Sequence, residues 1–374
     1  LTNLSINSAY SDYGSFVTNN ELLFTTARDT GNFVKREHTW TGDAFTTIHS
    51  GNLEEDSNVK TSKRLSSKIT SKFNESTPII SADGNTMYFT RNNYNGSRGF
   101  DAEKTTLLKI YRSLKDKHGN WSKAESLSIN SDAFSSAHPA LSSDGNTLYF
   151  ASDRPGGFGL SDIWKVAINA DGSLGTPQNL GDKINTGGRE TFPFVTSSNQ
   201  LYFSTDARPG LGGLDVYASQ LKTDGSLTDA QNVGSPVNSE WDDFAYYINP
   251  TNHQGFFSSN RPEGKGKDDI YSFVETRSLT FECLQQLKIR VIDSQSKEVI
   301  SNAKVTAYDG NYSALESTRQ YANNGYVFSE KFECGATYRF KAEHPDYLTN
   351  EVSVSLPNES GETERTIALE RKKI

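Results

Sequence analysis

The sequence has little of what a helical, a membrane-spanning or a nucleic-acid-binding protein needs. Its 374 residues include one methionine and two cysteines, and no apolar run approaches the ~20 residues that span a bilayer. The chain does not open on a basic segment followed by an apolar one, so we expect a soluble protein whose signal peptide, if it has one, has been removed or was never part of these residues. Lysine and arginine number 38 against 46 acidic residues, a net charge of −8 with no basic stripe, which argues against nucleic acid as a partner.

What the sequence does contain indicates strands. Glycine occurs 29 times, phenylalanine 21 times and tyrosine 17 times, and apolar residues hardly anywhere follow the helical period. This mixture favours an all-β protein of many short strands and tight turns. The length exceeds the size at which one core usually keeps growing, so we expect two domains or an array of repeats.

One glycine-rich segment occurs three times. The stretch ASDRPGGFGLSDIW at 151–164 returns as SSNRPEGKGKDDIY at 258–271 and, with one residue moved, as STDARPGLGGLDVY at 204–217. Each copy follows a strand that closes on phenylalanine, and two further strands close in the same way. The five closing residues are Phe24, Phe89, Phe150, Phe203 and Phe257, at intervals of 65, 61, 53 and 54 positions. The intervals predict one supersecondary unit per step.

Two more signals recur beside the closing phenylalanine. A strand opens on aspartate plus an aromatic residue at DIW (162), DVY (215), DIY (269) and DAF (43), and KIY at 109 has lysine instead. The unit then ends on a segment such as LSSKIT (65–70), LSIN (127–130), LGDKIN (180–185) or VGSPVN (233–238). Four strands with apolar faces and no covering helix must pack on neighbouring units, which radial repetition achieves.

We therefore predict an all-β fold with a five-bladed β-propeller over residues 1–277. The fifth unit ends at about residue 275 without a fourth strand, whereas LSINS at 4–8 is identical to LSINS at 127–131. Residues 4–7 are predicted to supply the missing outer strand. The ring would then close by pairing the first residues of the unit with its last.

The repeat carries a family resemblance. Its pattern, P-x-x-S-x-D-G-N-T-x-Y-F-x-S-D-R-x-G-G-x-G-x-x-D-I-W, resembles the TolB-type, WD-like propeller repeat of envelope proteins of the Bacteroidetes group. The resemblance covers residues 1 to about 275. It implies a fold and no particular activity.

Residues 281–374 form a second predicted domain. LKIRVID, AKVTAYD, GYVFSEKF and TYRFKAEH alternate apolar and polar residues, which predicts a small β-sandwich. Their order resembles the carboxypeptidase regulatory-like, transthyretin-type domain, which implies a fold without the catalytic zinc site. Its two cysteines, Cys283 and Cys334, are either free core thiols or a disulfide, and the resemblance to envelope proteins favours the disulfide.

The sequence shows no catalytic or metal-binding constellation. Its six histidines have no metal-ligand spacing, and no nucleophile elbow is present. Asp162, Asp215 and Asp269 recur at one position of the repeat, which is typical of a structural hydrogen bond. We therefore predict no catalytic residue, no metal and no cofactor.

Polar and aromatic residues are predicted to converge where the inner strands begin. The loop arginines are either bridged to carboxylates such as Glu75, Glu190 or Asp242, or they line a charged funnel for a peptide. Aromatic residues with arginine on a rigid scaffold are the usual anchors of protein interfaces. The predicted interaction face comprises Phe134, His138, Arg154, Phe158, Glu190, Arg208, Trp241, Asp242, Asp243 and Arg261.

Two functions from different classes fit these features. A propeller followed by a regulatory-like domain resembles the PorE type of OmpA-family proteins, which is linked to the type IX secretion system. This resemblance implies a non-enzymatic periplasmic scaffold, associated with the outer membrane, whose partners are other envelope proteins of the apparatus. Peptidoglycan would be bound only through an OmpA-like domain, which these residues do not include. The alternative is a glycan-binding or glycoside-hydrolase propeller with an accessory sandwich, which would use paired carboxylates.

Overall fold

The structure is a computed structural model that describes residues 1–28, 45–71, 73–92, 106–222, 224–281, 284–315, 320–322, 331–357 and 361–373. Every regular element within these ranges is a β-strand. No helix in them has the length and apolar character needed to cross a membrane. The chain forms two compact units, Leu1–Leu279 and Thr280–Ile374. The sequence analysis places the boundary between residues 277 and 281.

The described residues of unit 1 form five four-stranded antiparallel sheets, numbered here in chain order. Sheets 1 and 2 comprise β2 (Asp12–Thr18), β3 (Glu21–Thr26), β4 (Thr47–Asn52) and β5 (Lys63–Arg64), then β6 (Glu75–Ile80), β7 (Thr86–Asn92), β8 (Leu108–Leu114) and β9 (Glu125–Ser126). Sheets 3 and 4 comprise β10 (Ser136–Leu141), β11 (Thr147–Ser152), β12 (Asp162–Ala167) and β13 (Gln178–Asn179), then β14 (Glu190–Val195), β15 (Gln200–Thr205), β16 (Asp215–Gln220) and β17 (Gln231–Asn232). Sheet 5 comprises β18 (Asp243–Ile248), β19 (Gln254–Ser259), β20 (Asp269–Val274) and, from the N-terminus, β1 (Thr2–Asn3).

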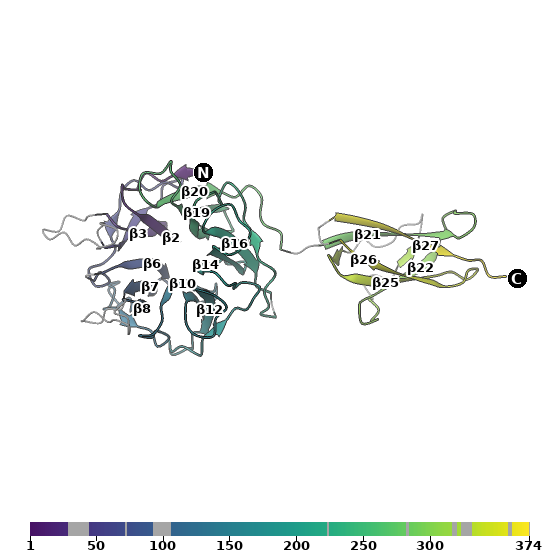
Figure 1. The fold of residues 1–374 in the computed structure, drawn as a ribbon, viewed down its shortest axis with the longest axis horizontal. Helices are drawn as coiled ribbons and strands as arrows, with labels where there is room; N and C mark the ends of the chain where they lie inside the picture. The colour runs from purple at the N-terminus through teal and green to yellow at the C-terminus, as the bar shows by residue number, and fades with distance from the viewer. Residues whose placement is uncertain are drawn as a thin grey trace. The chain divides into compact units, whose positions relative to one another are not determined.

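The first strands of the five sheets surround a common axis. β2, β6, β10, β14 and β18 each contact the next one, and β18 contacts β2. Figure 1 shows β2, β6, β10 and β14 around the centre of the ring, with later strands of each sheet farther out. This arrangement of four-stranded sheets is that of a β-propeller.

The two ends of unit 1 meet in sheet 5. Thr2 and Asn3 pair with Ser272 and Tyr271 of β20, and the N-terminus lies beside β20 in Figure 1. Residues 4–7, which were expected to form this strand, instead follow it as a turn.

An asparagine side chain explains why the outer strands are shorter than expected. The amide of Asn7 accepts the N–H of Ile270 and donates to its carbonyl oxygen, so one side chain replaces a further backbone pair. Asn130, Asn185 and Asn238 each form the same pair of hydrogen bonds with the backbone of a third-strand residue. The predicted LSIN-type segments are therefore turns that follow two-residue strands.

The third strand of sheet 1 begins after the predicted DAF motif. Phe24 pairs with His49 as Phe150 pairs with Trp164, so Thr47-Ile48-His49 occupies the position of DIW. The expected position was wrong because a histidine stands where the other sheets have tyrosine or tryptophan. Asp43 and Ala44 lie outside the described residues.

Apolar side chains of neighbouring sheets form the cores between them. All five closing phenylalanines are fully buried. One cluster, for example, joins Ile163 of sheet 3 to Leu201 and Phe203 of sheet 4. Burying one such aromatic side chain contributes about 1.5–3 kcal/mol, which makes the repeated phenylalanine a principal apolar anchor of each sheet.

The described residues of unit 2 form two sheets that share one core. Leu287 and Val291 of one sheet belong to the same apolar cluster as Val305 and Phe340 of the other. β21 (Leu284–Asp293) alternates buried and partly exposed positions, in agreement with a period of two. The sheet orders are β24-β21-β27 and β23-β22-β25-β26. These strands are β21 (Leu284–Asp293), β22 (Ala303–Tyr308), β23 (Gln320–Ala322), β24 (Lys331–Glu333), β25 (Thr337–Glu343), β26 (Asn350–Ser355) and β27 (Gly361–Leu369).

Candidate interaction face

The loops between second and third strands lie at one end of the ring, with the starts of the first strands. In sheet 3, Ser152 pairs both with Ser136, where β10 begins, and with Asp162, where β12 begins. We call this end of unit 1 the loop face. The residues of the predicted interaction face, except His138, lie in its loops or at its strand starts.

A buried aspartate closes the loop in sheets 3, 4 and 5. The carboxylate of Asp162 accepts the N–H groups of Phe158 at 2.6 Å and Gly159 at 3.1 Å. Asp215 binds Leu211 and Gly212 in the same way, and Asp269 binds Lys265 and Gly266. Each aspartate is only 1% exposed. The recurring carboxylate therefore holds the backbone of its loop in one conformation.

A glycine in each of these loops permits close contact with the next sheet. A Cβ atom on Gly159 would overlap the carbonyl oxygens of Thr186 and Gly188, in the segment that leads into sheet 4. The carbonyl oxygen of Ser161 accepts the N–H of Glu190 at 2.8 Å across the same contact. The loop thus fastens its sheet to the following one.

The loop arginines fasten each sheet to the preceding one. Every guanidinium donates to a main-chain carbonyl in the last segment of the preceding sheet and lies over an aromatic ring of its own sheet. The carbonyls are those of Ile6 for Arg28, Ile69 for Arg91, Ile129 for Arg154, Ile184 for Arg208 and Val237 for Arg261. The sequence analysis missed Arg28 and Arg91 because their loops depart from the repeat.

Three of these arginines also form ion pairs with a buried carboxylate at the start of their own sheet. The pairs are Arg28 with Asp12 at 2.8 Å, Arg91 with Glu75 at 3.1 Å and Arg261 with Asp243 at 2.5 Å. The counterpart of Glu75 in sheet 5 is therefore Asp243. The sequence analysis expected Asp242 in this role. Asp242 instead accepts the N–H of Leu214 and the amide of Asn260.

Sheets 3 and 4 depart from this ion-pair pattern. In sheet 3 the carboxylate position is held by Ser136, whose hydroxyl accepts a hydrogen bond from Arg154 at 3.1 Å. In sheet 4 Glu190 keeps the position, but its carboxylate is held by Thr186 and Thr205. Burial raises the pKa of Glu190, and these hydrogen bonds oppose the rise.

Burial decides which predicted residues a partner could touch. Glu190 and Asp243 are fully buried, which corrects their assignment to an accessible surface: they belong to the frame beneath it. Arg154, Arg208, Arg261, Phe134 and Asp242 are half-buried. Phe158 and Trp241 are exposed, by 55% and 41%.

Three exposed apolar residues of the loop face were missed. Leu160 and Leu211 are exposed by 58% and 57%, and Tyr10 by 37%. Leu211 precedes its loop aspartate by four residues, as Phe158 does. That shared position is the signal that could have found it.

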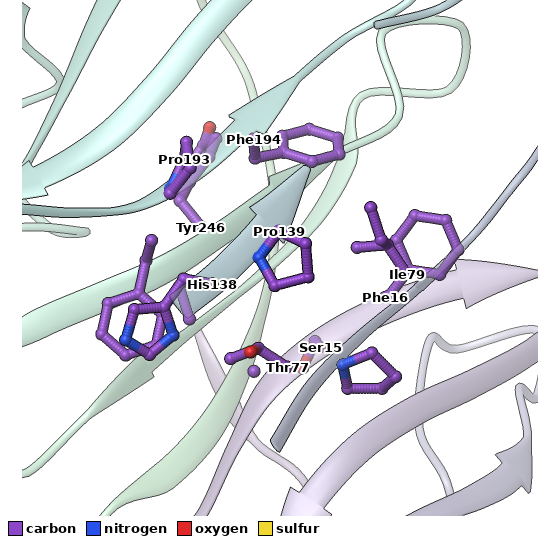
Figure 2. A pocket seen from close by; sticks show the side chains of 13 residues that line it. Ser15, Phe16, Thr77, Ile79, His138, Pro139, Pro193, Phe194 and Tyr246 are labelled. Carbon is purple, nitrogen blue, oxygen red and sulfur yellow. The ribbon is translucent and has the colours of Figure 1, made fainter. Parts of the chain in front are cut away.

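His138 lines a small cavity between the first strands of the sheets. It is one of five residues with positive φ, one at the register shift of each first strand: Gly14, Thr77, His138, Phe192 and Ala245. Its imidazole lies against the ring of Phe192, with ring centroids 3.8 Å apart and an angle of 31° between the ring planes. Figure 2 shows the cavity beside it, where side chains such as Phe16, Ile79 and Phe194 make the lining mostly apolar. The cavity, about 40 Å³ in volume, has room for a few water molecules.

Two histidines of unit 1 have strongly lowered pKa values. Burial lowers the pKa of His138 to about 3. Burial, with the charges of Arg28 and Arg64, lowers the pKa of His49 to about 4. Within the described residues, no three His, Cys, Asp or Glu side chains are placed to hold a metal ion.

The predicted disulfide involves a residue outside the described ranges. Cys283 is that residue, and it immediately precedes Leu284 in the sequence. Leu284 pairs with Glu333, which immediately precedes Cys334. The bond between the two cysteines stays a prediction.

Comparisons with known proteins yield matches among solved structures alone. No family model and no curated protein matches the chain. The putative TolB from Agrobacterium tumefaciens is 14% identical over 68% of this chain and 72% of its own, with a TM-score of 0.40. TolB from Acinetobacter baumannii is 13% identical, with coverages of 69% and 52% and a TM-score of 0.35. The GH43 endo-arabinanase from Bacillus licheniformis is 13% identical, with coverages of 73% and 96% and a TM-score of 0.46.

Proposed function

We propose that this chain is a non-enzymatic scaffold of a bacterial envelope that binds partner proteins through the loop face of unit 1. Unit 1 is a five-bladed TolB-like propeller closed by its N-terminal strand, and unit 2 is a carboxypeptidase regulatory-like sandwich. The protein acts in the periplasm, associated with the outer membrane, within a secretion apparatus of the type IX class. The observation that carries the proposal is the group of exposed apolar side chains on the loop face, Tyr10, Phe158, Leu160, Leu211 and Trp241.

The backbone under these side chains is held in place by hydrogen bonds. The N–H of Phe158 is bound to buried Asp162, and the N–H of Trp241 to the hydroxyl of Ser239 at 3.3 Å. A side chain on a backbone already ordered loses little further entropy when a partner binds. Exposed aromatic residues on such a frame are the usual anchors of a protein interface.

The main alternative is a glycan-binding or glycoside-hydrolase propeller. That function would use two carboxylates that differ from the repeat and face a substrate cleft. The buried carboxylates located on the loop face instead recur from sheet to sheet. They are bonded to loop N–H groups, as Asp162 is, to loop arginines, as Asp243 is, or, at Glu190, to Thr186 and Thr205. This use of the carboxylates supports the scaffold.

The test is capture of a partner from envelope extracts by the immobilised chain, followed by mass spectrometry. Phe158→Ala and Trp241→Ala together should abolish capture and leave the melting temperature unchanged, because both side chains are exposed. Leu114→Ala with Val274→Ala is the matched control, since these residues are 42% and 62% exposed and lie at the ends of strands away from the loop face.

Loss of capture in the control pair, or full capture by the loop-face pair, would contradict the proposed function. Release of reducing sugar from arabinan by the unmodified chain, lost on substitution of a single carboxylate, would establish the alternative.

A further inference from the structure

Arg154 in sheet 3 is a half-buried loop arginine without the carboxylate that its counterparts in sheets 1, 2 and 5 have. Sheets 1, 2 and 5 place aspartate or glutamate at the start of the first strand, beside the loop arginine. Sheet 3 places Ser136 there. Arg154 donates from Nε to Ser152 and from one terminal nitrogen to Ile129 and Ser136, each at 3.1 Å. Its other terminal nitrogen has no hydrogen bond to a described residue.

Aromatic rings surround this guanidinium. The rings of Phe134, Phe150 and Trp164 lie 4.9, 4.8 and 5.3 Å from its central carbon. Ring faces attract a cation, yet they do not replace the oxygen acceptors that an arginine edge requires. Burial lowers the pKa of Arg154 to about 10, and the charge of Asp153, which forms no ion pair with the guanidinium, opposes this shift only in part.

A second donor close by also lacks a partner. Trp164 is 7% exposed, and its indole N–H is buried without a hydrogen bond to any described residue. The nearest acidic neighbour in sequence, Asp153, is exposed and accepts the N–H of Ser135 at 2.7 Å. The guanidinium of Arg154 and the indole of Trp164 therefore offer hydrogen-bond donors and a positive charge. Neither group has a negatively charged acceptor bonded to it.

We propose that Arg154 binds an aspartate or glutamate side chain of the partner that docks on the loop face. The partner's carboxylate binds the terminal nitrogen that is left without a hydrogen bond, and so supplies the counter-ion that Asp12, Glu75 and Asp243 supply within their own sheets. Arg154 and Phe134 are half-buried and Pro155 is exposed, so the site is reached from the loop face. Because exposed Phe158 belongs to the same loop, the partner segment combines an acidic side chain with an apolar one. This inference rests on the proposed function and deepens it.

The experiment uses acetate as the carboxylate probe. Sodium acetate is titrated into the full chain at constant ionic strength, balanced with sodium chloride, while the side-chain N–H signals of arginine are followed by NMR. The signal of Arg154 should shift in a saturable manner, and that of Arg261, already paired with Asp243, should not. Ser136→Asp supplies the carboxylate from within and should weaken acetate binding about tenfold or more. Ser136→Ala, the matched control, should keep it.

Each outcome decides a separate point. No saturable shift at Arg154, or the same affinity in Ser136→Asp, overturns the inference even if Phe158→Ala with Trp241→Ala abolishes partner capture. Acetate binding at Arg154 with capture unaffected by those two substitutions would instead overturn the proposed function. If capture requires the partner's C-terminal carboxylate and not an acidic side chain, the assignment to aspartate or glutamate is wrong.

Discussion

Asp162, Asp215 and Asp269 show how a repeated polar residue serves the fold. Each carboxylate accepts two N–H groups of its own loop. A buried donor left without its acceptor costs about 1–3 kcal/mol, so the aspartate is required wherever this loop conformation recurs. The loop arginines follow the same logic, because the carbonyl that each one binds would otherwise lie unpaired between two sheets. At this scale, the positions that differ from the repeat are the informative ones.

His49 is one such position, and it predicts acid sensitivity. The residue is 5% exposed, and its Nε2 atom has no hydrogen bond to a described residue. Burial and the charges of Arg28 and Arg64 lower the pKa from 6.5 to about 4. Between these pH values the unfolded chain binds more protons than the folded one, so the free energy of unfolding falls as the pH falls. The full loss from this group is on the order of 3 kcal/mol.

The measurement is urea denaturation of the parent and of His49→Tyr at pH 7.5 and 4.5. Tyrosine occupies the equivalent position in sheets 2, 4 and 5, at Tyr111, Tyr217 and Tyr271. The variant should lose less stability on acidification than the parent does. His138 contributes a fall of the same sign to both proteins and cancels in the comparison. Equal losses in the two proteins would show that His49 does not carry this effect.

Each sheet of unit 1 is joined to both neighbours at the loop face. The loop reaches forward, as when Ser161 accepts the N–H of Glu190, and the arginine reaches back, as when Arg261 binds the carbonyl oxygen of Val237 at 2.8 Å. The apolar clusters between sheets fill the space beneath these bonds. The glycine-rich loop therefore recurs because it is the connector between successive sheets.

Gly212→Ala tests this connector. A Cβ atom there would overlap the backbone oxygens of Trp241 and Ser239, and backbone cannot move aside as a side chain can. We expect the variant to lose about 1–3 kcal/mol of stability in chemical denaturation. Gly187→Ala is the control, because its Cβ atom would meet no atom within 4 Å. Similar stability in the two variants would mean that the loop can move away from the next sheet without lowering the free energy of unfolding.

Closure of the ring is a property of the whole unit. β1 completes sheet 5 from the opposite end of the unit, and the following turn buries Leu4 and Ile6 in a cluster with Leu22 and Phe24 of sheet 1. The N-terminal segment therefore joins the last sheet to the first. Without it, β20 would present an unpaired edge.

Deleting residues 1–8 should lower the melting temperature by more than about 5 °C. The deletion removes the pairing with β20 and the burial of two aliphatic side chains, each worth about 1.5–3 kcal/mol. Differential scanning calorimetry gives the comparison, and deletion of Leu1 alone, which is 51% exposed, is the control. A deletion mutant that melts within a degree or two of the parent would show that the N-terminal segment does not hold the ring closed.

The predicted disulfide is tested by mass. The protein purified without reductant should be about two daltons lighter than after reduction, because bond formation removes two hydrogens. The pairing of Leu284 with Glu333, next to the two cysteines in sequence, supports this expectation. Rapid labelling of both thiols in the folded, unreduced protein would show that they are free.

Much of the fold could be read from local patterns. The interval between closing phenylalanines located the second strands, and all five of these side chains are buried. The LSINS duplication identified which end of the chain joins sheet 5, but it misplaced the strand because an asparagine side chain can substitute for backbone pairing. The third strand of sheet 1 was misplaced because histidine occupies position 49, where the other sheets have tyrosine or tryptophan.

The sequence by itself determined the all-β class and the period of the repeat, since both depend on residues close together along the chain. Only the tertiary structure decided which recurring polar side chains are bonded to partners inside the molecule. Asp243 forms an ion pair with Arg261. Arg154 instead donates a hydrogen bond to Ser136, where the arginines of sheets 1, 2 and 5 have a carboxylate. The exposure of Phe158 and the burial of Glu190 are set by the packing of successive sheets. That packing brings together segments far apart in sequence, which no local pattern reports.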